Sequence, residues 1–285
     1  MATRNWEEVR DLLRQWREEN VRRSEEIVDF WLTLLSKHVN KLGDEKWLVY
    51  EQVCIAALDC HNFILVQECL RTLDRQFPGS MRVRKLRAMK YEALERYEEA
   101  MKLYDSILQT DEANSVIYKR KIALLKAQNR IPDAIKELTE YLKKFMSDQE
   151  AWMELCSLYI QEQDYNKAAF CMEELILSNP HNHLYHQRYA EIQYTIGGPE
   201  GMKLARSYFA QAVKLNPHNM RALFGLFLSA SNSAVSAKTT AQKKKESLKY
   251  ATWAALQING KYQEQLCDDS QLKTVENMLT SLQIA

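Results

Sequence analysis

The chain is 285 residues long, with 46% apolar and 27% charged residues, and its formal net charge at pH 7 is only +1. So balanced a charge excludes the broad basic field expected of a nucleic-acid-binding protein. Only 7 glycines and 5 prolines are present, so the composition supplies little turn chemistry for a sheet and favours helices.

The sequence contains no segment that we expect to direct it into or across a membrane. The longest apolar run, around 222–230, is about half as long as a membrane-spanning helix. Residues 1–8 are largely polar, so we expect no secretory signal. No two cysteines have Cys-x-x-Cys spacing, and we expect a reduced, cytosolic protein. The cysteines are Cys54, Cys60, Cys69, Cys156, Cys171 and Cys267.

Two helices are predicted at the start of the chain. Apolar residues spaced by three and four positions predict a helix over 5–20. Ser24 is predicted to cap a second helix, which runs through Val39 and ends at Gly43. Neither helix carries the pattern that follows, so we predict that 1–46 forms N-terminal capping helices packed on the first repeat.

A 34-residue pattern occurs three times in succession, over 81–114, 115–148 and 149–182. In each copy an alanine is followed four positions later by a bulky residue. This pattern resembles the tetratricopeptide repeat (TPR), a helical hairpin whose small residue lets its two helices approach closely. The predicted structural positions are Ala100, Tyr104, Ala134, Leu138, Trp152, Tyr159, Ala168, Met172, Pro180, Ala205, Phe209 and Pro217.

The pattern continues less regularly on both sides of these copies. A degenerate copy occupies 47–80, and the copy at 183–219 has an insertion, which we place in the glycine-rich segment 197–201 between its helices. A loop insertion is predicted over 231–247, because this stretch is rich in Ser, Ala, Thr and Lys. An amphipathic C-terminal capping helix is predicted over 261–285.

Together these patterns predict an all-α protein. The predicted fold is a TPR-type α-solenoid over 47–260, a right-handed superhelix of helical hairpins with N- and C-terminal capping helices. Each hairpin alone would leave an apolar face in water, so the stability of such a solenoid comes from stacking neighbouring hairpins.

Residues able to do chemistry are sparse. His181, His183 and His186 lie near an inter-repeat turn, but no cysteine or carboxylate joins them at ligand spacing, which disfavours a zinc site. The sequence has no glycine-rich phosphate loop and no Gly-x-Ser-x-Gly motif. We therefore expect no enzyme, no catalytic residue, no cofactor and no metal.

Basic residues gather on two successive predicted first helices. In TPR folds the first helices line the concave groove, so these side chains are candidates for holding an acidic partner segment. The alternative is that they are solvated helix faces balanced by nearby glutamates. The candidate partner-binding residues are Arg82, Lys85, Lys119, Arg120 and Lys121.

One open function is that of a free TPR peptide-binding adaptor or co-chaperone. Co-chaperones that capture a C-terminal carboxylate need cations on the third of three successive first helices. This chain carries Glu150 and Glu154 there, and two acidic side chains would repel a carboxylate. The clamp function is therefore disfavoured, although the adaptor class stays open.

Segments beyond the repeat positions resemble a single family, subunit 2 of the ER membrane protein complex. The resemblance covers nearly the whole chain, including both predicted caps, and departs at the first few residues, the turn at 60–64 and the C-terminal tail. The segments that carry it are 16–20, 50–53, 55–59, 76–80, 148–152, 179–185 and 219–226.

The resemblance implies a non-catalytic cytosolic scaffold, peripheral on the cytoplasmic side of the endoplasmic reticulum membrane. The implied partners are the other subunits of the complex, namely membrane-embedded subunits through their cytosolic segments and a second soluble subunit. The implied role is to organise an insertase for tail-anchored and multipass membrane proteins. On this basis we hypothesise that Lys119, Arg120 and Lys121 hold an acidic partner segment or lie near the cytosolic vestibule, so that their charge reversal weakens assembly or insertion while the fold stays intact.

Overall fold

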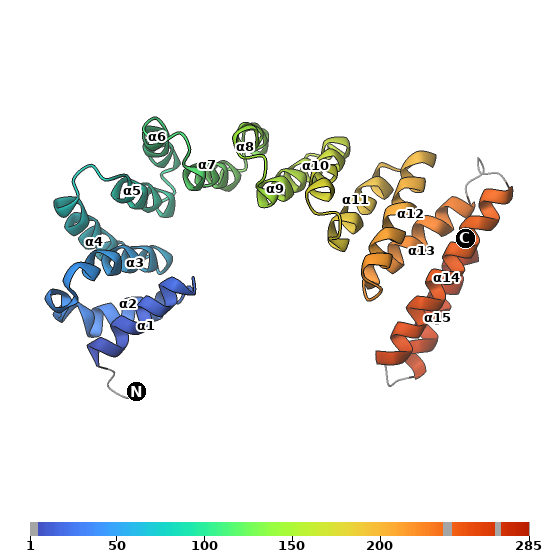
Figure 1. Cartoon of the computed structure of the whole chain (residues 1–285), viewed down its shortest axis with the longest axis horizontal. Coiled ribbons are helices and arrows are strands. Elements are labelled where there is room, and N and C mark those ends of the chain that lie inside the picture. The colour runs from blue at the N-terminus through green and yellow to red at the C-terminus, as the bar shows by residue number, and fades with distance from the viewer. Residues whose placement is uncertain (1–4, 236–240, 266–268, 285) are drawn as a thin grey trace. The chain divides into compact units, whose positions relative to one another are not determined.

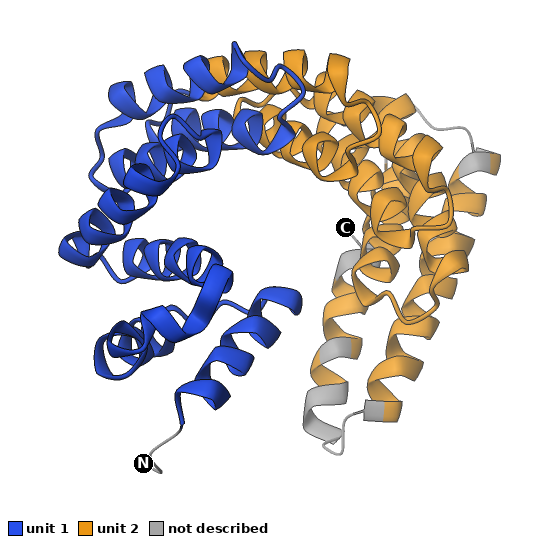
Figure 2. Ribbon diagram, turned by 60° about the vertical axis from the view of Figure 1, so that its left-hand side comes forward, with its two compact units in different colours: residues 1–130 blue, residues 131–285 orange. Residues whose placement is uncertain are grey.

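The computed structural model describes residues 5–235, 241–265 and 269–284. Over these residues the chain forms fifteen α-helices and two short 3-10 helices, with no strand. The predicted all-α class is therefore confirmed. The chain divides into two compact units, Met1–Arg130 and Ile131–Ala285, which Figure 2 colours separately.

Unit 1 holds the N-terminal helices and the first hairpins (Figure 1). Buried side chains of its first five α-helices form one hydrophobic cluster, so the N-terminal helices pack directly on the first hairpin. A second cluster joins α5, α6 and α7. The elements are α1 (Trp6–Glu18), α2 (Ser24–Thr33), η1 (Leu35–Lys37), η2 (Val39–Glu45), α3 (Lys46–Asp59), α4 (Phe63–Gln76), α5 (Met81–Ala93), α6 (Tyr97–Leu108) and α7 (Ser115–Ala127).

Unit 2 continues the succession of helices to the end of the described chain. Helix α13 packs against α12 on one side and against α14 on the other. The elements are α8 (Ile131–Lys144), α9 (Gln149–Gln161), α10 (Tyr165–Ser178), α11 (His183–Ile196), α12 (Gly198–Leu215), α13 (Met220–Val235), α14 (Ala241–Gln265) and α15 (Asp269–Ile284).

The repeated small and bulky positions lie in the core. The four alanines at the small position have no exposed surface, and the bulky residue four positions after each is buried. These pairs are Ala100 and Tyr104, Ala134 and Leu138, Ala168 and Met172, and Ala205 and Phe209. Trp152 and Tyr159 are only half-buried, and Pro180 and Pro217 are exposed in turns between hairpins.

The turns inside the hairpins also recur. His61, Glu95, Asn129 and Gln163 occupy the same place in successive copies, and each has φ between 56° and 61°. This left-handed conformation ends a helix by turning its last carbonyl groups toward backbone N–H donors. For a residue other than glycine it is uncommon, and its recurrence at one position shows that the hairpin geometry imposes it.

The second N-terminal helix is shorter than predicted. Helix α2 ends at Thr33, and the chain continues through η1 and η2, within which Gly43 adopts φ 56°. This break lets both Leu35 and Leu42 enter the core. Ser24 does not cap the helix, because its hydroxyl donates to Asp59 Oδ2 at 2.5 Å and Arg23 occupies the N-cap position.

The insertion in the copy at 183–219 is helical, not a loop. Only Gly197 lies between α11 and α12, and the rest of 197–201 forms the first turn of α12, which has a proline at its start. Proline is tolerated there because the first N–H groups of a helix have no partner within it. Gly201 is required by packing, since a Cβ atom there would lie 2.8 Å from the Gln193 carbonyl oxygen.

The predicted loop 231–247 is also largely helical. Helix α13 runs to Val235 and α14 begins at Ala241, while 236–240 lies outside the described residues. Ser233 fits a helix because its hydroxyl donates to the Ser229 carbonyl oxygen of the preceding turn at 2.7 Å. Helix α14 continues past the predicted boundary at 260, so the C-terminal cap predicted over 261–285 comprises the end of α14 and helix α15.

Candidate partner-binding site

The basic residues of α5 face a carboxylate of the preceding first helix. Arg82 Nη2 contacts Glu51 Oε2, and Lys85 Nζ lies 3.8 Å from Glu51 Oε1. The Glu51 side chain is 16% exposed, whereas that of Arg82 is 65% exposed. Two cations therefore share one carboxylate, and the more exposed of them extends into solvent.

The basic residues of α7 are also engaged within unit 1. Arg120 Nη1 lies 2.7 Å from Glu92 Oε2 on α5, and the Tyr104 hydroxyl of α6 donates to Glu92 Oε1 at 2.6 Å. Burial, together with the hydrogen bond to Glu92, raises the pKa of Tyr104 above its ordinary range. The Glu92 carboxylate thus joins three helices.

Lys121 and Lys119 complete the predicted set. Lys121 Nζ pairs with Asp105 Oδ1 of α6 at 2.9 Å, and its side chain is only 13% exposed. Lys119 is half-buried on the same helix. Reversal of Arg120 or Lys121 would set two carboxylates against each other in a partly buried site, so for these two residues we now expect charge reversal to lower stability as well as to weaken assembly.

Ion pairs and hydrogen bonds also hold the N-terminal helices against the residues that precede and end α3. Glu45 accepts hydrogen bonds from Arg14 and Arg17 of α1, and the bond from Arg14 is the largest cause of its lowered pKa. Asp59 at the end of α3 binds Arg22 and Ser24. Burial opposes ionisation of Asp59, but the hydrogen bonds from Arg22 and Ser24 outweigh it and lower its pKa.

The described thiols are poorly suited to nucleophilic chemistry. Burial raises the pKa of Cys54 and Cys171 to about 12 and that of Cys156 to about 11, so each stays protonated at neutral pH. Burial also raises the pKa of Cys69 and of Cys60. Cys267 lies outside the described residues.

Two of the three histidines near this turn, His183 and His186, contact structural partners. His186 is buried, and its Nε2 lies 2.8 Å from the Pro180 carbonyl oxygen. The His183 ring nitrogens lie 3.1 Å and 2.9 Å from the side-chain amides of Asn216 and Asn219. Within the described part of the chain, no group of three or more histidine, cysteine, aspartate or glutamate side chains is arranged to hold a metal ion.

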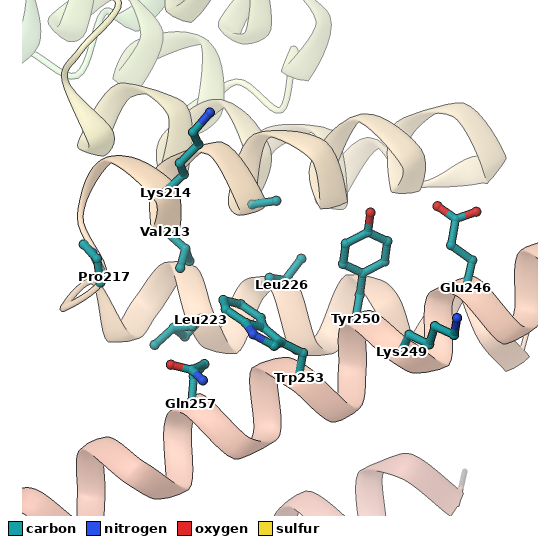
Figure 3. Close-up of a pocket in the computed structure, with 11 residues that line it drawn as sticks. Val213, Lys214, Pro217, Leu223, Leu226, Glu246, Lys249, Tyr250, Trp253 and Gln257 are labelled. Carbon is teal, nitrogen blue, oxygen red and sulfur yellow. The ribbon is translucent and has the colours of Figure 1, made fainter.

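Unit 2 contains an apolar groove that the sequence did not predict. It lies over α13 between α12 and α14 and has a volume of about 780 Å³. Figure 3 shows Tyr250 and Trp253 projecting from α14 toward the other two helices. We call it the α12–α14 groove; its lining residues are Ala210, Val213, Lys214, Pro217, Leu223, Leu226, Glu246, Lys249, Tyr250, Trp253 and Gln257.

The groove was missed because part of α14 was predicted to be a loop. A signal was nevertheless present in the sequence. Ala251, Ala254 and Ile258 have the same spacing as Ala168, Cys171 and Leu175 of α10, and all six are buried. That match would have identified α14 as the second helix of a hairpin.

A family model and full-length relatives both match this chain, and both concern the same protein family. A family model described as the EMC2 TPR-like repeat domain matches residues 63–200. Subunit 2-A of the ER membrane protein complex from Xenopus laevis is 54% identical over 283 residues, covering 98% of this chain and 95% of that protein. Subunit 2 from Dictyostelium discoideum is 31% identical over 274 residues, covering 90% of this chain and 84% of that protein.

Solved structures share the architecture. The C-terminal part of a TPR repeat-containing protein from Cytophaga hutchinsonii matches with a TM-score of 0.61 at 13% identity, covering 93% of this chain and 98% of that structure. At this identity the likeness shows the fold alone, which is a TPR solenoid. No helix in the described ranges is long and apolar enough to cross a bilayer.

Proposed function

Because the chain belongs to the family of ER membrane protein complex subunit 2, we propose that it is a non-catalytic scaffold subunit of that complex. The observation that carries the proposal is similarity over nearly the full length of both proteins, which includes the N-terminal helices and α13 as well as the repeats. The scaffold is proposed to lie on the cytoplasmic side of the endoplasmic reticulum membrane.

Its proposed role is to hold the cytosolic segments of membrane-embedded subunits, and a second soluble subunit, in an insertase for tail-anchored and multipass membrane proteins. The fold suits this role because a solenoid of stacked hairpins presents a long surface for extended contacts. The raised pKa of the buried thiols and the structural contacts of His183 and His186 support a function without bond-making chemistry.

Recovery of the chain from detergent-solubilised membranes tests this proposal. An affinity-tagged full-length chain should bring down several integral membrane proteins in stoichiometric amounts. Recovery of the chain alone, or with a single chaperone, would contradict the scaffold role and favour a free adaptor.

Among the predicted partner-binding residues, we propose that Arg82 and Lys85 face a partner. They share Glu51, so an excess positive charge remains, and Arg82 is largely exposed. Reversal of a charge at the rim of an interface weakens binding modestly. We expect Arg82→Glu to lower recovery of at least one membrane subunit about three- to tenfold.

A matched substitution separates binding from general charge effects. Arg96 has a comparable exposure, but it lies just before the second helix α6 and pairs with Glu99 three residues away. Arg96→Glu should leave recovery of every subunit unchanged. Equal losses with both variants would refute a specific partner contact at Arg82.

A further inference from the structure

The floor of the α12–α14 groove is buried, whereas the aromatic side chains of its α14 wall are exposed to solvent. Leu223 and Leu226 form the floor on α13, and each is 1% exposed. By contrast, Trp253 is 45% exposed and Tyr250 is 40% exposed on the α14 wall. An indole and a phenol ring left half in water beside a recess are the kind of apolar surface that marks an interaction site.

An equivalent groove lies two repeats earlier in the same unit. It runs over α9 between α8 and α10 and has a volume of about 400 Å³. We call it the α8–α10 groove. Its residues Thr139, Leu142, Lys143, Met146, Trp152 and Leu155 occupy the same repeat positions as Ala210, Val213, Lys214, Pro217, Leu223 and Leu226 of the α12–α14 groove.

The two grooves differ in the state of their lysines. In the α8–α10 groove Lys143 pairs with Glu140 at 2.6 Å and Lys167 pairs with Asp164 at 2.7 Å. In the α12–α14 groove the exposed Lys214 and Lys249 form no ion pair with any residue that the structure describes. The lysines of the α8–α10 groove are therefore neutralised by carboxylates of this chain, while the rim of the α12–α14 groove keeps a positive charge.

Neighbouring residues strengthen the positive character of the α12–α14 rim. Lys245 lies on the adjoining face of α14, beside Leu248 and Leu256. The Arg206 guanidinium stacks 5.2 Å from the Tyr250 ring and donates to the Ser247 hydroxyl at 2.7 Å. Glu246 is the acidic side chain in the described lining. An apolar trough edged by unpaired cations is complementary to a partner with an apolar face and acidic flanks.

We propose that the α12–α14 groove binds an amphipathic helix of another subunit, with its apolar face against Tyr250 and Trp253 and acidic residues beside Lys214 and Lys249. The α14 wall extends from Glu246 to Gln257, which corresponds to about three helical turns, or about 16 Å. A helix of that length presents apolar side chains at positions i, i+3 or i+4, and i+7, the spacing by which helices occupy grooves between other helices. This inference rests on the proposed scaffold role, because it takes the partner from the same complex.

A lipid surface fits the groove less well. The rings of Tyr250 and Trp253 point into the space between α14 and the other two helices (Figure 3), so the apolar surface that lines the groove is recessed, whereas Leu248 and Leu256 are exposed on the adjoining face of α14. A helix that binds at a membrane interface instead presents its apolar residues on an outward face, where they can enter the lipid. The recess therefore favours a helical protein segment over a bilayer.

Photocrosslinking within the assembled complex tests the inference. A photoreactive amino acid replaces Gln257, which lines the groove from α14, in the full chain purified with its membrane subunits. We expect crosslinks to one segment of another subunit that has helical apolar spacing and an excess of aspartate and glutamate. A crosslinker at Met146, which lines the α8–α10 groove and is 70% exposed, should not reach that segment.

Charge reversal then tests the lysines. The double variant Lys214→Glu and Lys249→Glu should lower the crosslink yield at Gln257 about fivefold or more. The matched double variant Lys143→Glu and Lys167→Glu in the α8–α10 groove should keep the yield within about twofold.

Several results would overturn the inference. They are a crosslink to lipid, a crosslink to a basic or non-helical segment, an unchanged yield in the Lys214 and Lys249 double variant, or no crosslink in a complex that retains its membrane subunits. The last result would leave the scaffold role standing. If the chain recovered no membrane subunit at all, the scaffold proposal would fail, and the groove inference would fail with it.

Discussion

Basic side chains have different surroundings in the first helices of unit 1 and in the α12–α14 groove of unit 2. Arg120 and Lys121 are held by carboxylates of neighbouring helices and are partly buried. Lys214 and Lys249 are exposed beside an apolar groove and have no ion-pair partner in the described structure. The comparison shows that a cluster of basic residues in a sequence does not identify a binding surface, because the carboxylates of adjacent helices decide which charges remain available.

The contrast has a simple physical basis. A cation that is paired in a partly buried site must be separated from its own carboxylate before it can bind a carboxylate of a partner protein. The carboxylate left behind is then a partly buried charge without a partner, which is unfavourable. An unpaired lysine on an exposed rim can bind an acidic partner without that penalty. We therefore expect substitutions of Arg120 and Lys121 to change stability first, and substitutions of Lys214 and Lys249 to change binding alone.

The largest effect should come from breaking the packing of the repeats themselves. Ala168 has no exposed surface and lies at a small position of the repeat. Ala168→Glu would bury a carboxylate with no partner and lower the free energy of unfolding by about 3–5 kcal/mol, measured by urea denaturation. Ala127→Glu on an exposed helix end should change it by no more than about 0.5 kcal/mol. A parent-like midpoint for Ala168→Glu would show that the assigned repeat positions are wrong.

The next largest effect concerns the paired cations. Arg120→Glu would place a second carboxylate beside Glu92, which also accepts the hydrogen bond from Tyr104. We expect the free energy of unfolding of the full chain to fall by about 1–2 kcal/mol, since the pair is partly buried. Arg120→Gln should lose less, because an amide can still donate to Glu92. If both variants denatured at the parent concentration of urea, the pairing would have no structural role.

A smaller effect is expected from pH on the N-terminal helices. The pKa values of Glu45 and Asp59 are lowered in the folded protein, so their stabilisation is complete above the ordinary carboxyl pKa of about 4. It is lost as the pH falls through the lower folded-state values. Hydrogen exchange should therefore show α1 and α2 losing protection below about pH 4. Glu45→Gln combined with Asp59→Asn should weaken this dependence, and protection that rises on acidification would contradict the assignment.

The smallest effect on stability is expected at the groove. Lys214 and Lys249 form no described ion pair that a substitution could break. The double variant Lys214→Glu and Lys249→Glu should change the free energy of unfolding by no more than about 0.5 kcal/mol, in contrast to Arg120→Glu. A loss as large as that of Arg120→Glu would mean that these lysines serve the fold, and the difference between the two regions would disappear.

Most of the fold could be predicted because its packing is periodic. Ala100, Ala134 and Ala168 recur at one spacing, and a residue buried at a helix crossing has to be small wherever that crossing repeats. Prediction failed where the residue types are typical of turns but are also compatible with a helix. Ser233 and the first turn of α12 are examples, because hydroxyl-to-carbonyl bonds and a proline at the helix start are both compatible with a helix.

The candidate binding surfaces were harder to predict than the fold. Arg120 is adjacent in sequence to basic residues, yet its partner Glu92 is on another helix, so the pairing depends on the register between helices. The α12–α14 groove depends on three helices, one of which was predicted to start later than it does. Helical periodicity places a residue on a face of its own helix, but it does not show which side chains of other helices meet that face.

The most direct test of the contrast combines two measurements on two variants. For Arg120→Glu and for the Lys214→Glu and Lys249→Glu double variant, the urea midpoint of the full chain and the Gln257 crosslink yield in the assembled complex are compared with those of the parent. We predict that the first variant lowers the midpoint, while the second keeps the midpoint and lowers the crosslink yield about fivefold or more. A groove variant that lost stability and crosslinking together, or kept both, would contradict the distinction between cations that hold the fold and cations left for a partner.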